Sequence, residues 1–147
     1  MHELPAPAAT PGVVLDTNAV LDWLVFADRR IAPLAAAIEA GSLAWLAAPR
    51  MRAELADVLL RPAMARRVRS GEPVLTAFDR LARGCDPPPR ASAGLTCSDV
   101  DDQVFLDLAL AERARWLVTR DKALLALHRR ARLHGLTIAV PEAWRDG

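Results

Sequence analysis

Four carboxylates stand at points of the sequence where an α/β chain could bring them together. They are Asp16, Glu54, Asp102 and Asp121. The first and the last each follow a short apolar run, over 13–15 and 116–119. The second lies one turn into the helix expected after another apolar run, and the third opens the amphipathic segment 99–113. If these runs are neighbouring strands of one parallel sheet, all four carboxylates meet at its carboxyl edge, where such sheets bind ligands.

Such a cluster predicts a site for a divalent cation. Four unpaired carboxylates repel one another, and a bound cation offsets that repulsion. Mg²⁺ and Mn²⁺ favour oxygen ligands, keep some of their water and accept phosphate oxygens from a substrate. One or two such ions can activate water and stabilise the leaving oxygen of a phosphodiester. The acids therefore favour metal-dependent phosphodiester hydrolysis, which needs no histidine or lysine base.

Each acid also has a purely structural interpretation. The two acids that follow apolar runs could cap the helices that come next. Ser98 and Asp101 have the spacing of a capping box, and Asp99 and Asp102 suit the positive end of a helix dipole. Glu54 could be an ordinary solvated acid on a helix surface. Gathered at one sheet edge, however, the four acids favour the metal site.

The elements that must position these acids alternate along the chain. Strands are predicted over 13–15, 42–48, 116–119 and 137–140, and helices over 19–26, 31–40, 50–60, 63–68, 73–83, 99–113 and 122–133. The segment 84–94 is rich in proline and is expected to be an exposed loop. Strands that alternate with helices indicate βαβ units and a parallel sheet.

Length and composition predict one globular domain. The chain has 147 residues, of which 52% are hydrophobic, and we expect a flexible leader over 1–11 and a single domain over 12–147. A net charge of +1 excludes a wholly basic protein that coats DNA, and an aromatic share of 5% argues against base stacking on aromatic side chains. Bases are concentrated in segment 61–90, where Arg61, Arg66, Arg67 and Arg69 could line a path for RNA. An ordinary solvated helix face is the alternative for these four.

The positions of the cysteines and histidines argue against a structural zinc site and indicate the cellular compartment. Cys85 and Cys97 form no CxxC pair, and the three histidines have no zinc-ligand spacing. Free thiols and the lack of a secretion signal predict a cytoplasmic protein. The apolar stretch 13–26 is interrupted by Asp16, Asn18 and Asp22, so no contact with a membrane is expected.

Three segments together resemble the PIN domain family. They read VVLDTNAVLDWL, PRMRAELADVLLRP and CSDVDDQVFLDLALAERARWLVTRDKALLAL. The resemblance runs from about residue 13 to residue 141 and is strongest to the toxins of bacterial toxin–antitoxin systems. It implies a three-layer α/β/α sandwich around a central parallel sheet of four to five strands. It also implies a Mg²⁺- or Mn²⁺-dependent ribonuclease with RNA as its substrate, a cognate antitoxin as its partner, and a homodimer.

The resemblance also assigns roles to single residues. The four metal-site acids of the family fall on Asp16, Glu54, Asp102 and Asp121. A further acid of this branch falls on Asp99, whereas Asp101 fits only with a shift of one residue. Asn18 matches the polar residue that supports the first acid, and Thr119 matches the small hydroxyl residue beside the last. Arg120 departs from the glycine frequent in this branch; it could contact the scissile phosphate or be a turn residue in solvent.

The resemblance implies a mechanism, and the sequence also allows other functions to be compared with it. A metal held by Asp16, Asp102 and Asp121 would polarise the phosphate and lower the pKa of a bound water, while Glu54 would hold a second ion or orient a water. A haloacid-dehalogenase site needs DxD, but Asn18 stands at its third position. A receiver domain needs a different placement of its lysine. The remaining alternative is a non-catalytic PIN-like module that acts by binding an antitoxin or itself.

Overall fold

The computed structural model describes residues 10–91 and 93–146. The predicted leader over 1–11 falls almost wholly outside these residues. Among the described residues, no helix combines the length and the apolar character needed to span a membrane.

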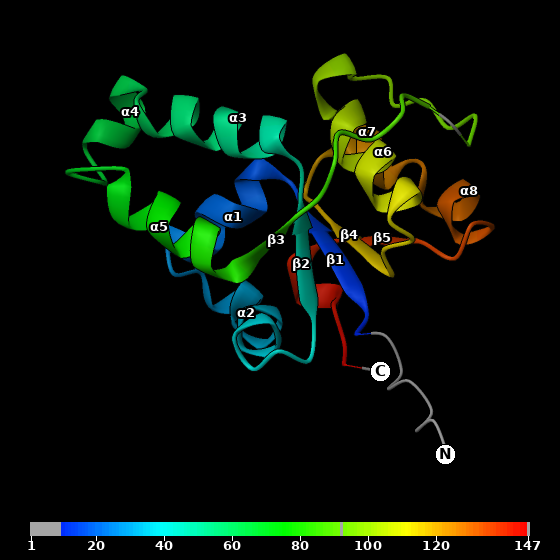
Figure 1. The fold of residues 1–147 in the computed structure, drawn as a ribbon, viewed down its shortest axis with the longest axis horizontal. Helices are drawn as coiled ribbons and strands as arrows, with labels where there is room; N and C mark the ends of the chain where they lie inside the picture. The colour runs from blue at the N-terminus through cyan, green and yellow to red at the C-terminus, as the bar shows by residue number, and fades with distance from the viewer. Residues whose placement is uncertain (1–9, 92, 147) are drawn as a thin grey trace, which may run out of the picture.

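A five-stranded parallel sheet forms the centre of the molecule (Figure 1). Its strands are β1 (Gly12–Leu15), β2 (Ala44–Ala47), β3 (Ala82–Gly84), β4 (Trp116–Val118) and β5 (Thr137–Ala139), and their order across the sheet is β3-β2-β1-β4-β5. Strand β1 lies between β2 and β4, with Val13 opposite both Trp45 and Trp116. The carboxyl ends of all five strands therefore lie at one edge.

Helices cover both faces of the sheet. They are α1 (Thr17–Leu24), α2 (Ala32–Glu39), α3 (Pro49–Leu59), α4 (Pro62–Ala65), α5 (Glu72–Leu81), α6 (Gln103–Ala111), α7 (Lys122–Leu125) and α8 (His128–Arg132), with short 3₁₀ turns η1 (Arg29–Ile31), η2 (Val100–Asp102) and η3 (Pro141–Ala143). In Figure 1, α1 to α5 lie on one side of the strands and α6 to α8 on the other. The predicted α/β/α sandwich is confirmed.

The helix boundaries follow from local chemistry. Asp16 caps α1 with its side chain. Pro49 opens α3 at the first helical position, where a missing N–H has no consequence. Gly41 follows α2 with φ of +79°, a left-handed conformation that favours glycine.

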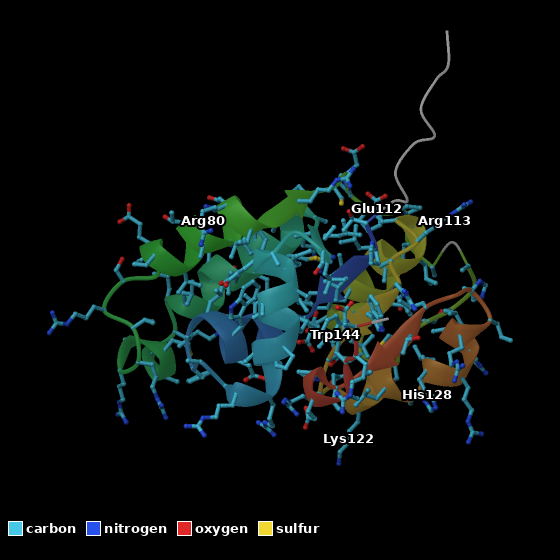
Figure 2. The ribbon with its side chains drawn as sticks, turned by 90° about the horizontal axis from the view of Figure 1, so that it is seen from below. Arg80, Glu112, Arg113, Lys122, His128 and Trp144 are labelled. Atoms are coloured by element: carbon cyan, nitrogen blue, oxygen red, sulfur yellow. The ribbon has the colours of Figure 1, made fainter. Side chains whose placement is uncertain are left out.

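Aromatic side chains join the sheet to its helices. Trp45 of β2 is buried and packs against Trp23 of α1 and Phe78 of α5, with ring centroids 5.3 and 4.9 Å away. On the other half of the sheet, Trp144 packs on Trp116 with a centroid separation of 5.8 Å. Trp144 is buried, and Figure 2 labels it near the middle of the view. This contact fastens the C-terminal segment to the core.

Three predicted elements need correction. The sequence predicts the end of a helix and the start of a loop where the structure has strand β3. Its sequence ARG carries no apolar signal, and the strand forms only through backbone pairing with β2. The helix expected over 122–133 is two helices, α7 and α8. The helix expected over 99–113 begins as the 3₁₀ turn η2 and ends at Ala111.

Candidate metal centre

The carboxyl ends of β1 and β4 lie side by side. The two strands pair with Leu15 opposite Val118, and the Asp16 N–H donates to the Val118 carbonyl at 3.2 Å. Asp16 and Thr119 are therefore the first residues beyond the paired ends of neighbouring strands. Both are buried, so their polar side chains need partners in the protein.

Thr119 connects the two acids that follow these strands. Asp16 accepts the Ala19 N–H at 2.8 Å through Oδ1 and the Thr119 hydroxyl through Oδ2. The Thr119 oxygen in turn accepts the Asp121 N–H at 2.9 Å. Asp121 caps α7 by accepting the Leu124 N–H at 3.0 Å. The prediction that Asp16 and Asp121 cap the helices that follow them is thus confirmed, and the capping bonds fix the position of each carboxylate.

Asp99, Asp102 and Asp121 converge at the same edge. Each offers one carboxylate oxygen, and the three oxygens lie within 4.8 Å of one another. Asp99 precedes η2 as its cap and accepts the Asp101 N–H at 3.0 Å, and Asp102 is the last residue of η2. Asp16 is outside this triad but interacts with it electrostatically. The charge of Asp16 raises the pKa of Asp102, and the charge of Asp121 raises the pKa of Asp16. We call Asp16, Asp99, Asp102 and Asp121 the acidic cluster.

The charges of the acidic cluster are poorly compensated. Burial raises the pKa of Asp16 to about 6, although hydrogen bonds from Thr119 and Ala19 oppose that rise. Burial also raises the pKa of Asp102 to about 7, and the charges of Asp121, Asp99 and Asp16 add to the effect. Within residues 10–91 and 93–146, no arginine or lysine forms an ion pair with any of the four. The cluster therefore lacks positive charge.

This donor set fits a hard divalent cation. It consists of carboxylate oxygens, the ligands that Mg²⁺ and Mn²⁺ prefer, without the thiol or imidazole groups of a zinc site. The triad brings three such oxygens to a common point. A cation there would offset the repulsion that adds to the effect of burial on the pKa of Asp102.

Glu54 lies beside the cluster and is held by a residue that sequence analysis missed. Its Oε2 accepts the Thr17 hydroxyl at 2.8 Å, and Thr17 follows Asp16 directly. This bond ties α3 to the start of α1. Glu54 is not one of the triad acids. The only sequence signal for Thr17 is its place next to Asp16.

Asn18 and Asp101 have a more peripheral place. Both are exposed, and the Asn18 side chain makes no hydrogen bond to a described residue. The expected capping box of Ser98 and Asp101 does not form. Asp99 is the cap instead, because its carboxylate reaches the Asp101 N–H.

The four candidate arginines for RNA contact, Arg61, Arg66, Arg67 and Arg69, lie in and around α4. All four are exposed. Arg67 lies over the ring of Phe26, with its guanidinium carbon 5.4 Å from the centroid. In Figure 1, α4 and α6 are well separated, with α3 running between them. An RNA strand that touched both α4 and the acidic cluster would therefore pass along α3.

Arg120, a candidate for contact with the scissile phosphate, is held by two ion pairs and is not a turn residue free in solvent. Its guanidinium forms ion pairs with Asp22 at 3.3 Å and with Glu142 at 2.9 Å, and its side chain is 30% exposed. Arg120 stands between Thr119 and Asp121. Its ion pairs fasten this connection to α1 and to η3.

Known proteins share this architecture. The sequence matches the family described as PIN domain over residues 12–123. No curated protein sequence matches the chain at a significant level. The crystal structure of PAE2754 from Pyrobaculum aerophilum is similar with a TM-score of 0.57 and 22% identity, over 89% of this chain and 85% of that one. The crystal structure of VapBC2 from Rickettsia felis, bound to a DNA fragment from their promoter, is similar with a TM-score of 0.57 and 16% identity, over 86% and 96%.

The two structural likenesses show the fold, and the family match covers most of the chain. It includes β1, β4 and every member of the acidic cluster. PIN domains are in general metal-dependent nucleases. The chain belongs to the PIN domain family.

Proposed function

We propose that this chain is a Mg²⁺- or Mn²⁺-dependent endoribonuclease that hydrolyses RNA phosphodiesters in the cytoplasm. One observation carries the proposal: the carboxylate oxygens of Asp99, Asp102 and Asp121 lie within 4.8 Å of one another, beside the buried Asp16. None of these acids has an ion-pair partner among the described residues. Family membership supports the nuclease class.

The residues of the chain divide the work of the site. The acidic cluster would hold the cation, which when bound supplies Lewis-acid polarisation of the phosphate and activation of a water. Thr119 holds the Asp16 carboxylate and the Asp121 backbone in a fixed relation. Glu54 is oriented by Thr17 through Oε2, which leaves Oε1 able to accept a hydrogen bond from an attacking water.

The proposal extends to a biological role. The motifs of this chain resemble toxins of type II toxin–antitoxin systems, and a VapBC2 structure shares its fold. We infer an antitoxin protein and a second copy of this chain as partners. Expression in a bacterial host should then arrest growth, and the Asp16→Asn variant should not.

Cleavage of a mixed RNA pool tests the activity. Wild-type protein should cut RNA with Mg²⁺ or Mn²⁺ and should stop cutting in EDTA. Asp16→Asn should abolish cleavage, whereas Asp101→Asn, which changes an exposed neighbour outside the cluster, should leave it within about twofold. Cleavage that persists in EDTA, or that Asp16→Asn leaves intact, would overturn the proposal.

A further inference from the structure

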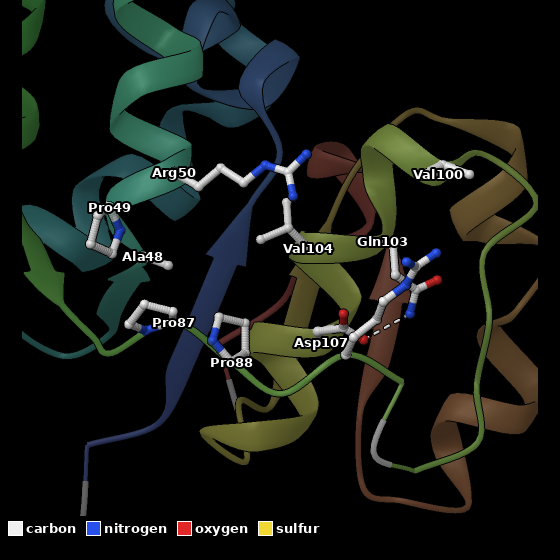
Figure 3. A pocket seen from close by; sticks show the side chains of 10 residues that line it. Ala48, Pro49, Arg50, Pro87, Pro88, Val100, Gln103, Val104 and Asp107 are labelled. Atoms are coloured by element: carbon white, nitrogen blue, oxygen red, sulfur yellow. Dashed lines mark hydrogen bonds between the residues drawn. The ribbon is translucent and has the colours of Figure 1, made fainter.

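A pocket of about 220 Å³ lies beside the acidic cluster, between α3, α6 and the loop after β3 (Figure 3). Two of its walls continue into the site. On α3, Arg50 lines the pocket and Glu54 follows one turn later, a rise of about 6 Å. On the other side, Val100 and Gln103 line the pocket, and Asp102 lies between them in the sequence. The pocket therefore adjoins Glu54 along α3 and Asp102 along the chain.

The walls and the rim of this pocket differ in character. Pro49, Pro87 and Pro88 supply rigid, flat, apolar surfaces, and we call the cavity the proline pocket. Arg50 and Arg90 also line it, and both are exposed. Neither forms an ion pair with another residue of the described chain. Figure 3 shows Arg50 reaching from α3 toward Val104 on α6. Two unpaired guanidinium groups at an apolar hollow favour a ligand that carries both a ring and a negative charge.

The floor of the proline pocket offers one hydrogen-bond acceptor. Gln103 and Asp107 are each 5% exposed. Both polar atoms of the Gln103 amide are hydrogen-bonded within the protein. Its oxygen accepts the Cys97 N–H, and its nitrogen donates to the Leu95 carbonyl and to Asp107 Oδ1. Oδ1 of Asp107 also accepts the Ala91 N–H.

The other Asp107 oxygen, Oδ2, has no partner among the described residues. It points from the floor toward Val104 (Figure 3). A carboxylate oxygen without a partner at the floor of the pocket favours a ligand with an N–H group.

We propose that the proline pocket binds one nucleobase of the RNA strand next to the bond that is cut, and that Arg50 and Arg90 bind the adjoining phosphates. The inference rests on the proposed function for the identity of the polymer. A base that carries an exocyclic amino group can donate to Asp107 Oδ2, as cytosine does through N4. The single N–H of uracil lies between two carbonyl oxygens, which a carboxylate repels. The pocket therefore prefers cytosine to uracil, two bases of the same ring size.

Fluorescence anisotropy with labelled oligo-C and oligo-U tests this preference. Asp16→Asn protein serves as the parent, so that no strand is cut during the measurement. The parent should bind oligo-C about tenfold tighter than oligo-U. Val104→Trp, which fills the pocket, should remove this difference. Arg50→Gln should weaken both strands several-fold, and the matched control Arg52→Gln, on the same helix but paired with Asp79, should weaken neither.

The outcomes separate the pocket from the proposed activity. Equal binding of the two strands by a folded parent, or a preference that survives Val104→Trp, overturns the proline pocket while cleavage by wild type would still stand. A preference that depends on Val104 in a protein that cuts no RNA supports the pocket and overturns the activity. If RNA binding is unchanged in both pocket variants but a protein partner is lost, the pocket serves a protein and the inference is overturned.

Discussion

At the residue scale, Asp16 and Asp102 are charges that the fold tolerates poorly on its own. The pKa of Asp16 is raised to about 6 and that of Asp102 to about 7, in both cases first by burial. The native state therefore holds these protons more tightly than the unfolded chain does. Ionisation of either group at neutral pH lowers the free energy of unfolding of the metal-free protein.

Replacing Asp102 with asparagine should accordingly stabilise the metal-free protein. In EDTA at pH 7.5, Asp102→Asn should raise the thermal unfolding midpoint by about 2–4 °C, since it removes a repelled charge from a half-buried position. Scanning calorimetry checks this, with Asp101→Asn as the control that should change the midpoint by less than about 1 °C. A lower midpoint for Asp102→Asn would mean that the carboxylate stabilises the fold.

At the scale of elements, the connection from β4 to α7 is held by ion pairs that reach across the fold. Arg120 bonds to Asp22, 98 positions earlier, and to Glu142 of η3. The same Glu142 lies 3.8 Å from Arg30, whose own side chain is 55% exposed.

Removal of Arg120 should therefore cost more than removal of Arg30. We expect Arg120→Ala to lower the free energy of unfolding by about 1–2 kcal/mol, because among the described residues it leaves Asp22 without an ion-pair partner and Glu142 with only the more distant Arg30. Arg30→Ala should lower it by clearly less, because pairs of exposed charges contribute little to stability. Urea titrations compare the two, and equal losses would show that Arg120 has no special role in holding the connection.

Elements with a local signal could be predicted, and those without one could not. The strands β1, β2, β4 and β5 are largely apolar runs that alternate with helices, so their sequence reveals them. Strand β3 has no such run and depends on a neighbour already in place. Apolar spacing continues across 126–127, so the break between α7 and α8 carries no sequence signal.

In the candidate metal centre, too, residues with a local sequence signal could be predicted and the others could not. Asp16 and Asp121 could be found because each acid follows a predicted strand and precedes a helix. The Thr17–Glu54 bond depends on how α1 packs on α3, and the pairing of Arg120 depends on residues about a hundred and about twenty positions away. Arg50 stands one turn before Glu54 in a predicted helix, which was the available signal for the proline pocket. No local pattern pointed to Asp107.

At the scale of the whole molecule, positive and negative charge are separated although the net charge is only +1. The acidic cluster lies at the carboxyl edge of the sheet, and four exposed arginines lie around α4. If these arginines contact phosphates, each contact releases counterions when RNA binds.

Salt dependence tests the role of the α4 arginines. Joint replacement of Arg61, Arg66, Arg67 and Arg69 by glutamine should reduce the slope of log affinity against log salt by up to about 3, at about 0.7 per phosphate contact on a single strand. The loss of affinity should be similar for all RNA sequences. An unchanged slope would indicate that this surface is an ordinary solvated helix face.

The stability of the whole domain should also depend on pH in an unusual direction. In EDTA, the free energy of unfolding should fall as pH rises from about 5 to 8, with about 1.4 kcal/mol from Asp16 alone. The acids with lowered pKa, Asp28, Asp79 and Glu142, act below this window and do not oppose the trend. Urea titrations at each pH measure it. A free energy that rises over this range would contradict the burial of uncompensated carboxylates.

Titration of Mn²⁺ into the metal-free protein at pH 7.5, followed by calorimetry, tests the central claim most directly. We predict saturable binding by the wild type, the same binding by Asp101→Asn, and at least a tenfold loss of affinity in Asp102→Asn, because one of the three converging carboxylates is removed. Wild-type protein that is folded and binds no Mn²⁺, or a folded Asp102→Asn variant that binds it as tightly, would contradict the assignment of the acidic cluster as a metal centre.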